Sequence, residues 1–290
     1  MAASIVDIRK LAQVMLRDKG FYSGEIDGLW GKGSNAAFAE YSGFLRTSKL
    51  EIGGEDAIVE DAMVEDAGVG RVSGVVVLDP GHGGTHKTGG SSPNNATSSS
   101  GVAEKTMTLE LAKLVRKELN RISSARPHSN IEVHLTRAGD RNLGLTDRAK
   151  VARAKAANVF VSIHYNGYNG RVRGTETLIL SAKNGNKNPV DDRALAERVQ
   201  SGVFSALQNH DPSARNRGVK DNQRLGVLKD VHLQNPRAEL KTRACLLEVE
   251  FIDVETVDEL LNTGKNAKTV RLDVARAMAQ AIVEDLEAHS

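Results

Sequence analysis

Apolar and polar positions alternate in two different patterns over residues 74–290. Short apolar runs bounded by Gly, Pro or polar residues predict strands at about 74–79, 131–136, 158–163, 174–180, 225–229 and 244–249. Segments with apolar residues at helical spacing predict helices near 104–121, 146–156, 189–208 and 266–287. Strands that alternate with helices are typical of an α/β fold, here with a mixed central sheet flanked by helices.

The first 48 residues follow a purely helical pattern. Ile5, Ile8, Leu11 and Met15 are spaced as on one helix face, a break follows at Lys19-Gly20, and a second helix is predicted from Ser34 to about Leu45. The chain is therefore expected to begin with a small all-α domain.

This N-terminal segment resembles the small three-helix peptidoglycan-binding domain. The resemblance rests on Gly20-Phe21-Tyr22, Asp27-Gly28-Leu29-Trp30-Gly31 and Ala36-Ala37-Phe38, and it departs from the family where Gly33-Ser34 replaces the usual Thr. It implies a cell-wall binding domain over residues 1–48. The alternative is that Phe21 and Trp30 form the core of a helical domain without a ligand.

An acidic segment separates the two regions. Residues 51–69 nearly repeat with a period of five, which is neither a helix nor a strand period, and they contain seven acidic residues and no basic one. Because like charges repel, residues 49–73 are predicted to form an extended, solvated linker before a larger domain over 74–290. A second interpretation is that the acidic segment docks on the larger domain as an intramolecular inhibitor.

Composition narrows the classes of partner. The net charge of +2 divides into +2 for residues 1–49, −6 for 50–73 and +6 for 74–290. A basic larger domain suits an anionic polymer such as cell wall or nucleic acid, but an aromatic content of 4% argues against base stacking, so no nucleic-acid partner is expected.

The chain also lacks several signals. No apolar run approaches the ~20 residues needed to span a bilayer, so no membrane insertion is expected. The N-terminus lacks the basic and apolar regions of a signal peptide, so we expect synthesis to end in the cytoplasm. Cys245 is the single cysteine and can form neither an internal disulfide nor a thiolate zinc site.

Candidate chemistry lies where predicted strands end. The apolar run at 75–78 stops at a turn that exposes His82, and the run at 159–163 delivers His164 in the same way. Glu248 follows the apolar residues 244–247, and Glu104 begins a helix directly after a polar loop, residues 89–101, which is predicted to be mobile.

Two imidazoles and one carboxylate can hold zinc with a position open for water, and a further carboxylate can act as a base. That combination suits hydrolysis of an amide. The candidate ligands are dispersed along the chain, however, so their spacing alone is a weak indication of a metal.

Residues 74–287 resemble the zinc-dependent N-acetylmuramoyl-L-alanine amidases whose catalytic domain opens with a strand and Asp-Pro-Gly-His-Gly-Gly. The family's motifs occur in order as Asp79-Pro80-Gly81-His82-Gly83-Gly84, Glu104-Lys105, Leu135-Thr136-Arg137, Leu145-Thr146-Asp147-Arg148, Ser162-Ile163-His164-Tyr165-Asn166 and Leu247-Glu248-Val249-Glu250-Phe251. The resemblance implies Zn²⁺ held by His82, Glu104 and His164, with Glu248 as the catalytic acid and base. The implied reaction cleaves peptidoglycan between the muramic acid lactyl group and L-alanine.

One position departs from this family. Glu250 stands where the family usually has Gly, and strand alternation places it on the same face as Glu248, so it is a candidate to line the cleft or share the proton. Asn166 and Arg137 are further candidates for substrate contacts, although Arg137 and Arg148 are more simply interpreted as braces for loops or carboxylates.

Three functional interpretations follow. The first is a bacteriolytic, endolysin-like amidase of a phage or prophage, released to the cell wall by a holin. The second is a zinc peptidase that cuts within the stem peptide, because the same ligands serve any amide. The third is a catalytically silent cell-wall-binding protein.

Overall fold

The computed structural model describes residues 5–18, 22–29, 31, 33–34, 37, 72–126, 128–222, 225–234 and 241–290. The chain divides into two compact units, Met1–Glu65 and Asp66–Ser290, and each is described by itself.

The N-terminal unit contains helix α1 (Ile5–Asp18), as the apolar spacing predicts. The side chain of Gln13 is fully buried and organises the segment that follows: its Oε1 accepts a hydrogen bond from Gly28 N at 2.8 Å, and its Nε2 donates to Asp27 Oδ1 and Leu29 O, both at 3.0 Å. A buried amide needs such partners, so Gln13 fixes the turn at residues 27–29. Most of the predicted second helix, together with Phe21, Trp30 and the acidic segment, lies outside the described residues.

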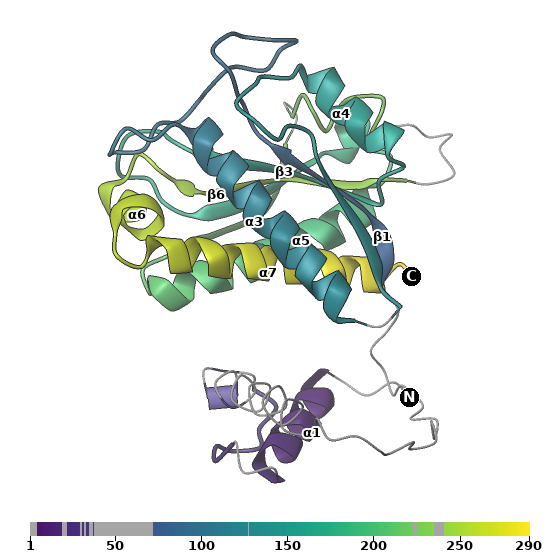
Figure 1. Ribbon diagram of the computed structural model, residues 1–290, viewed down its shortest axis with the longest axis vertical. Coiled ribbons are helices and arrows are strands. Elements are labelled where there is room, and N and C mark those ends of the chain that lie inside the picture. The colour runs from purple at the N-terminus through teal and green to yellow at the C-terminus, as the bar shows by residue number, and fades with distance from the viewer. Residues whose placement is uncertain are drawn as a thin grey trace, which may run out of the picture. The chain divides into compact units, whose positions relative to one another are not determined.

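The larger unit is built on a six-stranded sheet (Figure 1). Its strands are β1 (Ser73–Pro80), β2 (Asn130–Leu135), β3 (Val159–Asn166), β4 (Thr175–Leu180), β5 (Asn216–Asn222) and β6 (Arg243–Phe251), in the spatial order β2-β1-β3-β6-β4-β5. Strands β2, β1, β3 and β6 pair in parallel, β4 runs antiparallel to β6, and β5 is parallel to β4. The sheet is therefore mixed, as predicted.

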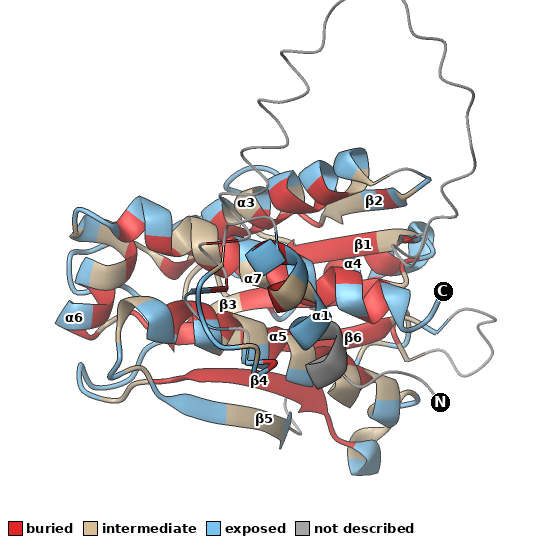
Figure 2. Ribbon diagram, turned by 90° about the horizontal axis from the view of Figure 1, so that it is seen from below, coloured by how far each residue is buried: buried red, intermediate tan, exposed pale blue. Residues whose placement is uncertain are grey.

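Helices cover both faces of the sheet. On one face α3 (Glu104–Ala125), α5 (Pro189–His210) and α7 (Ala267–Glu287) bury their apolar residues in the main core, and on the other face α4 (Leu145–Ala154) closes a smaller core (Figure 1). Alternate residues of β3 enter the two cores, and the central strands are buried along most of their length (Figure 2). A short helix, α6 (Glu255–Asp258), and a π-helical turn at Glu259–Thr263 precede α7.

One predicted strand is wrong. Residues 225–229 form turns rather than a strand, and their apolar side chains pack in the core on the α4 side. The sixth strand is instead β5, whose sequence Asn-Arg-Gly-Val-Lys-Asp-Asn is almost entirely polar. A strand at the edge of a sheet needs no apolar run, so a search for such runs could not find it.

The loop at 89–101 makes several hydrogen bonds to its surroundings, and its mobility stays a prediction. Asp258 Oδ2 accepts hydrogen bonds from Ser99 Oγ at 3.1 Å and from Ser100 N at 2.9 Å, and Thr97 forms a bridge to Ala103. The bonds to Asp258 hold the loop against α6, and the bridge to Ala103 holds it against the start of α3. None of the described helices is long and apolar enough to cross a membrane.

Candidate functional site

The site forms at the edge of the sheet where the parallel strands end. Strands β1, β3 and β6 are neighbours that run in the same direction, so their carboxyl ends meet at one edge. His82 follows β1 by two residues, His164 lies near the end of β3, and Glu248 lies opposite His164 on β6. The topology thus brings together side chains that are far apart in the sequence.

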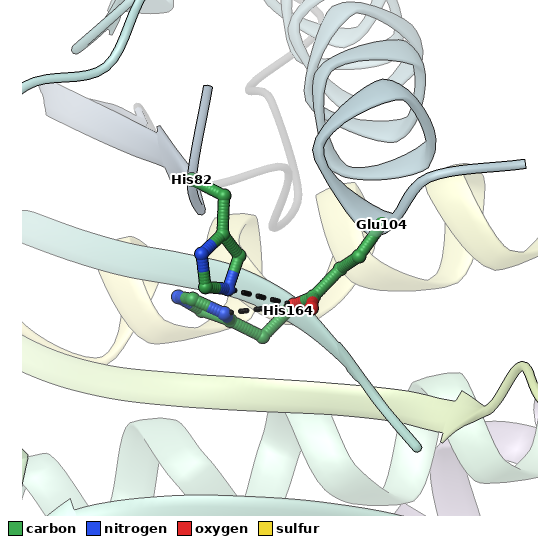
Figure 3. A group of neighbouring side chains, drawn as sticks. All are labelled: His82, Glu104 and His164. Atoms are coloured by element: carbon green, nitrogen blue, oxygen red, sulfur yellow. Dashed lines mark hydrogen bonds and ion pairs between the residues drawn. The ribbon is translucent and has the colours of Figure 1, made fainter. Parts of the chain in front are cut away.

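The side chains of His82, Glu104 and His164 converge (Figure 3). Glu104 Oε1 lies 3.2 Å from His82 Nε2 and 3.0 Å from His164 Nδ1, and the two imidazole rings meet edge to face with centroids 4.9 Å apart. One ligand atom from each residue lies within 4.8 Å of the others, a spacing that permits one metal ion to contact all three.

Backbone amides hold the Glu104 carboxylate in place. Its Oε2 accepts a hydrogen bond from Ala96 N at 2.9 Å, and its Oε1 accepts one from Tyr165 N at 3.1 Å. Burial alone would raise the pKa of Glu104, but hydrogen bonds from His164 and His82 outweigh burial and hold that pKa well below its usual range. The carboxyl group is therefore ionised and oriented towards the two rings.

The loop at 89–101 also orients His82. Ring atom Nδ1 lies 3.1 Å from the carbonyl oxygen of Ser92 and 3.0 Å from its hydroxyl. Because a carbonyl oxygen only accepts hydrogen bonds, this contact favours a proton on Nδ1, so Nε2, the ring atom that faces Glu104, is the atom that would bind a metal ion. His82 also has a φ of 61°, a conformation that costs energy for a residue with a side chain and is held by its surroundings.

Two arginines hold the backbone that carries His82. Arg137 donates from Nε to Pro80 O at 2.9 Å and from Nη2 to Gly81 O at 2.8 Å, while Arg148 donates from Nη1 to Pro80 O at 2.7 Å and from Nη2 to His82 O at 2.8 Å. Both side chains are buried, at 1% and 2% exposure. These contacts agree with the interpretation of both arginines as braces, and a substrate contact by Arg137 stays a prediction.

A buried ion pair lies beneath this turn. Asp79 Oδ1 accepts hydrogen bonds from Arg148 Nη1 at 2.8 Å and Thr136 Oγ1 at 2.5 Å, and Oδ2 accepts one from Ser162 Oγ at 2.8 Å. Burial opposes ionisation of Asp79, but the charge of Arg148 and these hydrogen bonds keep its pKa below the usual value. The motif residues Asp79, Thr136, Arg148 and Ser162 therefore form the foundation of the site.

Glu248 is not held by the protein in the way that Glu104 is. Its Oε2 is buried and has no hydrogen-bond partner within the described part of the chain. Burial, together with the charges of Glu104 and Glu176, raises its pKa well above the usual value. A buried polar atom without a partner is costly, so its presence beside the His–Glu–His cluster indicates a group reserved for chemistry.

Glu250, by contrast, is fully engaged by the protein. It is 2% exposed, Arg173 Nε lies 3.2 Å from its Oε1, and Gly174 N donates to its Oε2. Asn166 donates from Nδ2 to Glu176 Oε1 at 3.1 Å and is partly exposed. Substrate contacts by Glu250 and Asn166 stay predictions, and these partners favour a structural role for Glu250.

A cavity of about 140 Å³ lies beside the cluster on the α4 side of the sheet. Both histidines line it, together with Ser91, Leu145 and Val227. Val227 comes from the segment that was predicted to be a strand. The two imidazole rings therefore border a small cavity whose other walls are partly apolar.

The sequence did not indicate two of the residues that shape this site. Ser92 acts through its backbone carbonyl as well as its hydroxyl, and the Ser-rich composition of its loop does not distinguish it from its neighbours. Glu176 lies opposite Glu248 in the β4–β6 pairing, and only the sheet order brings it there. An acid two residues before the apolar run Leu178-Ile179-Leu180 was the one available signal.

Fold and site together define a mixed α/β protein with a two-histidine, one-carboxylate cluster and a neighbouring free carboxylate at the sheet edge. A family model described as N-acetylmuramoyl-L-alanine amidase matches residues 76–282. The chain therefore belongs to the N-acetylmuramoyl-L-alanine amidase family.

Individual relatives agree with this assignment. The chain is 39% identical over 236 residues to N-acetylmuramoyl-L-alanine amidase AmiA of Escherichia coli (72% of this chain, 75% of AmiA), and 28% identical over 205 residues to the endolysin of Bacillus phage SPP1 (68% and 69%). An uncharacterized cell wall amidase of Bacillus anthracis is 42% identical over 78 residues, but the match spans 26% of this chain and only 14% of that protein.

A solved structure is similar as well. The catalytic domain of CwlV, an N-acetylmuramoyl-L-alanine amidase from Bacillus (Paenibacillus) polymyxa var. colistinus, matches with a TM-score of 0.53 and 28% identity. The match covers 73% of this chain and 97% of that domain. The 73% of the chain that matches is close to the length of the unit Asp66–Ser290.

Proposed function

We propose that this protein hydrolyses the amide bond between the lactyl group of N-acetylmuramic acid and the L-alanine of the peptidoglycan stem peptide. The observation that carries the proposal is the pairing of two features at one sheet edge. Ligand atoms of His82, Glu104 and His164 lie within 4.8 Å of one another, and Glu248 beside them has a buried oxygen without a partner. Membership of the amidase family supports the choice of bond.

The donor set fits zinc. Two imidazole nitrogens and one carboxylate oxygen are ligands that Zn²⁺ accepts, and three protein ligands leave a coordination position for water. We assign His82 Nε2, His164 Nδ1 and Glu104 to this role. When bound there, zinc would supply Lewis acidity that lowers the pKa of a water and stabilises negative charge on the carbonyl oxygen.

Glu248 moves the protons. In the proposed mechanism its carboxylate takes a proton from the attacking water, whose oxygen forms a bond to the lactyl carbonyl carbon. Glu248 then returns this proton to the alanine nitrogen as the carbon–nitrogen bond breaks, so the products are a free amine and a lactyl carboxylic acid, which releases its remaining proton to solvent at neutral pH. The raised pKa of Glu248 suits a group that must both accept and donate a proton.

The N-terminal unit is proposed to bind peptidoglycan, and residues 49–73 to tether it to the catalytic unit at 74–290. The Gln13-held turn at Asp27-Gly28-Leu29 supports this, because it is part of the segment that resembles the peptidoglycan-binding domain. A tethered binding unit raises the local concentration of the enzyme on an insoluble polymer without sharing in the chemistry.

We further propose an endolysin-like role, with holin-type release to the wall. The similarity to the endolysin of phage SPP1 supports this role. Expression of the chain in a bacterium with and without a holin tests it, since lysis is expected only when both are present. Lysis by the chain alone would argue for another route of delivery.

Product analysis tests the reaction. Digestion of purified peptidoglycan is expected to release peptides with free L-alanine amino termini and no new reducing sugar ends. A peptidase that cuts within the stem peptide would expose other amino termini, and a silent wall-binding protein would expose none. Removal of metal with phenanthroline should abolish the products, and added Zn²⁺ should restore them.

Paired substitutions test the role of Glu248. Glu248→Gln keeps the shape of the side chain but removes the proton acceptor, so kcat is expected to fall by about 10²- to 10⁴-fold. Glu250→Gln changes the same side chain two residues away, where Arg173 and Gly174 already engage it, and most activity should remain. Equal losses in both variants would contradict the assignment of Glu248 alone.

A further inference from the structure

A row of polar side chains crosses the sheet beside the cluster. His164 on β3 pairs in register with Glu248 on β6, Glu248 pairs with Glu176 on β4, and Glu176 pairs with Gly218 on β5. Residues opposite each other on adjacent strands project from the same face. The row therefore extends the site across four strands, away from the two imidazoles.

The outer end of this row carries two cations. Glu176 Oε2 accepts a hydrogen bond from Arg217 Nε at 2.7 Å and another from Lys220 Nζ. Both basic side chains come from the edge strand β5, and they are 33% and 42% exposed, whereas Glu176 is 12% exposed. Two cations share one carboxylate oxygen, so among the described residues one of the two positive charges has no carboxylate of its own.

Arg217 keeps unused donors. Its guanidinium carbon lies 5.2 Å from the centre of the Phe251 ring, which holds the plane of the group. Within the described residues neither of its two Nη atoms has a hydrogen-bond acceptor, while Nε is occupied by Glu176. The guanidinium group is held by Glu176 through Nε, and its two Nη atoms are suited to bind both oxygens of a carboxylate.

The space above the end of the row is open. Gly218 has a φ of 74°, and a Cβ added there would meet no heavy atom of the described residues within 4 Å. Lys220 follows Gly218 by two residues and therefore projects from the same face as Glu176. The sheet edge thus offers both a gap and an exposed cation at one place.

We propose that Arg217 and Lys220 bind the carboxylate of an acidic residue that directly follows the alanine of the substrate's peptide. This subsite rests on the proposed function, because the scissile amide must lie at the His82–Glu104–His164 cluster. It makes β5 a specificity element that selects substrates with a negative charge at this position.

The distance from Glu248 to the two cations matches the length of an extended dipeptide. Adjacent strands lie about 4.8 Å apart, so the cations held at Glu176 lie one to two strand spacings, about 5 to 10 Å, from Glu248 on β6. An extended peptide advances about 3.3 to 3.6 Å per residue, so the second residue lies about 7 Å along the chain from the scissile nitrogen. A peptide that crosses the strands along the row therefore brings its second residue to the cations.

Two soluble muramoyl tripeptides provide the test. They differ only in the residue after alanine, whose carboxyl group outside the peptide backbone is a free carboxylate in one and a neutral carboxamide in the other. The zinc-loaded full chain is expected to favour the carboxylate substrate by about 10-fold in kcat/KM, as charge-assisted hydrogen bonds are lost with the carboxamide. In Arg217→Gln and in Lys220→Gln this ratio is expected to fall towards one.

Arg193→Gln is the matched control. Arg193, in α5, forms an ion pair with Asp221 of β5. Asp221 follows Lys220 directly and therefore projects from the opposite face of the strand. Both rates and their ratio should stay as in the unchanged protein. A ratio that persists in Arg217→Gln and Lys220→Gln, or an equal loss on both substrates, overturns the proposal.

A binding measurement separates this proposal from the proposed function. Calorimetry with the Glu248→Gln variant compares the two tripeptides without turnover, and the carboxylate form should bind about 10-fold more tightly. If the unchanged protein cuts neither substrate at the lactyl–alanine bond, the proposed function fails. Equal binding of the two tripeptides overturns the carboxylate subsite whether or not the bond is cut.

Discussion

At the scale of the residue, Gly81 sets the distance between the two histidines. A Cβ at this position would come within 3.0 Å of three ring atoms of His164, so only glycine lets that ring pass over the turn that carries His82. The backbone of Gly81 is fixed as well, because its N–H donates to Ile163 O at 2.9 Å and its carbonyl accepts from Arg137. Glycine is thus required at position 81 to make room for the His164 side chain of the neighbouring strand, and not for the conformation of its own turn.

Gly81→Ala should therefore displace His164 and disturb the cluster. We expect loss of most bound zinc after dialysis and a fall in kcat/KM of about 10²-fold, since small displacements of reacting groups are costly. Elemental analysis and the product assay measure both quantities. Gly139→Ala is the control, because a Cβ at Gly139 meets no atom within 4 Å. Full zinc content in Gly81→Ala would refute this account.

At the scale of the element, a carboxyl group connects α5 to β6. Strand β4 pairs with β6 only at residues 246–248, so Ala244 N lacks a strand partner on that side. Asp192, in the first turn of α5, supplies the acceptor: its Oδ1 bonds to Ala244 N at 2.8 Å and its Oδ2 to Asn186 Nδ2 at 2.9 Å. A helix side chain thus completes the hydrogen bonding of a central strand.

Burial of this group should make stability depend on pH. Burial raises the pKa of Asp192 from 3.8 to about 7, despite the hydrogen bonds from Ala244 and Asn186. A carboxyl group with a raised pKa in the folded state contributes stability that is full below about pH 4 and lost as pH rises through about 7. A shift of this size corresponds to at most about 4 kcal/mol.

Calorimetric scans at pH 5 and pH 8 measure this effect. The melting temperature should fall more between these values in the unchanged protein than in Asp192→Asn, which does not titrate. Asp191→Asn removes a neighbouring carboxylate whose side chain is 44% exposed, and it should keep most of the original pH dependence, because burial raises the pKa of Asp192 more than the charge of Asp191 does. The same fall in all three proteins would show that Asp192 is not responsible.

At the scale of the whole molecule, chemistry and wall attachment are proposed to reside in separate units. Every residue of the proposed centre lies in the unit Asp66–Ser290, which has its own two hydrophobic cores. The resemblance to a wall-binding domain lies in the unit Met1–Glu65. Nothing in the proposed mechanism requires a side chain from the N-terminal unit.

A protein that contains only residues 72–290 should therefore keep its kcat/KM on a soluble muramoyl peptide. Its rate on insoluble peptidoglycan is expected to fall by about 10- to 100-fold at low enzyme concentration, because the local concentration provided by the tether is lost. Co-sedimentation with cell walls measures the binding. Unchanged sedimentation would place the wall-binding surface in the larger unit instead.

Much of the fold was predictable because local patterns carried it. Five of the six strands and the helices α3, α4, α5 and α7 follow from apolar runs and helical spacing. The exceptions have physical reasons. Strand β5 is polar because its edge faces solvent, and the apolar residues Leu225, Val227 and Leu228 form turns because burial on the α4 side satisfies them without a strand.

The sequence by itself determined which side chains end the buried strands, since a histidine or a carboxylate after an apolar run must emerge at a sheet edge. The resemblance to the amidases supplied their proposed roles. Only the tertiary structure decided which of these groups meet and which are already engaged. Glu248 and Glu250 are two residues apart on one strand, yet one has a buried oxygen without a partner and the other is held by Arg173 and Gly174. The order of strands, which no local pattern encodes, makes that difference and places Glu176 with its two cations beside the proposed base.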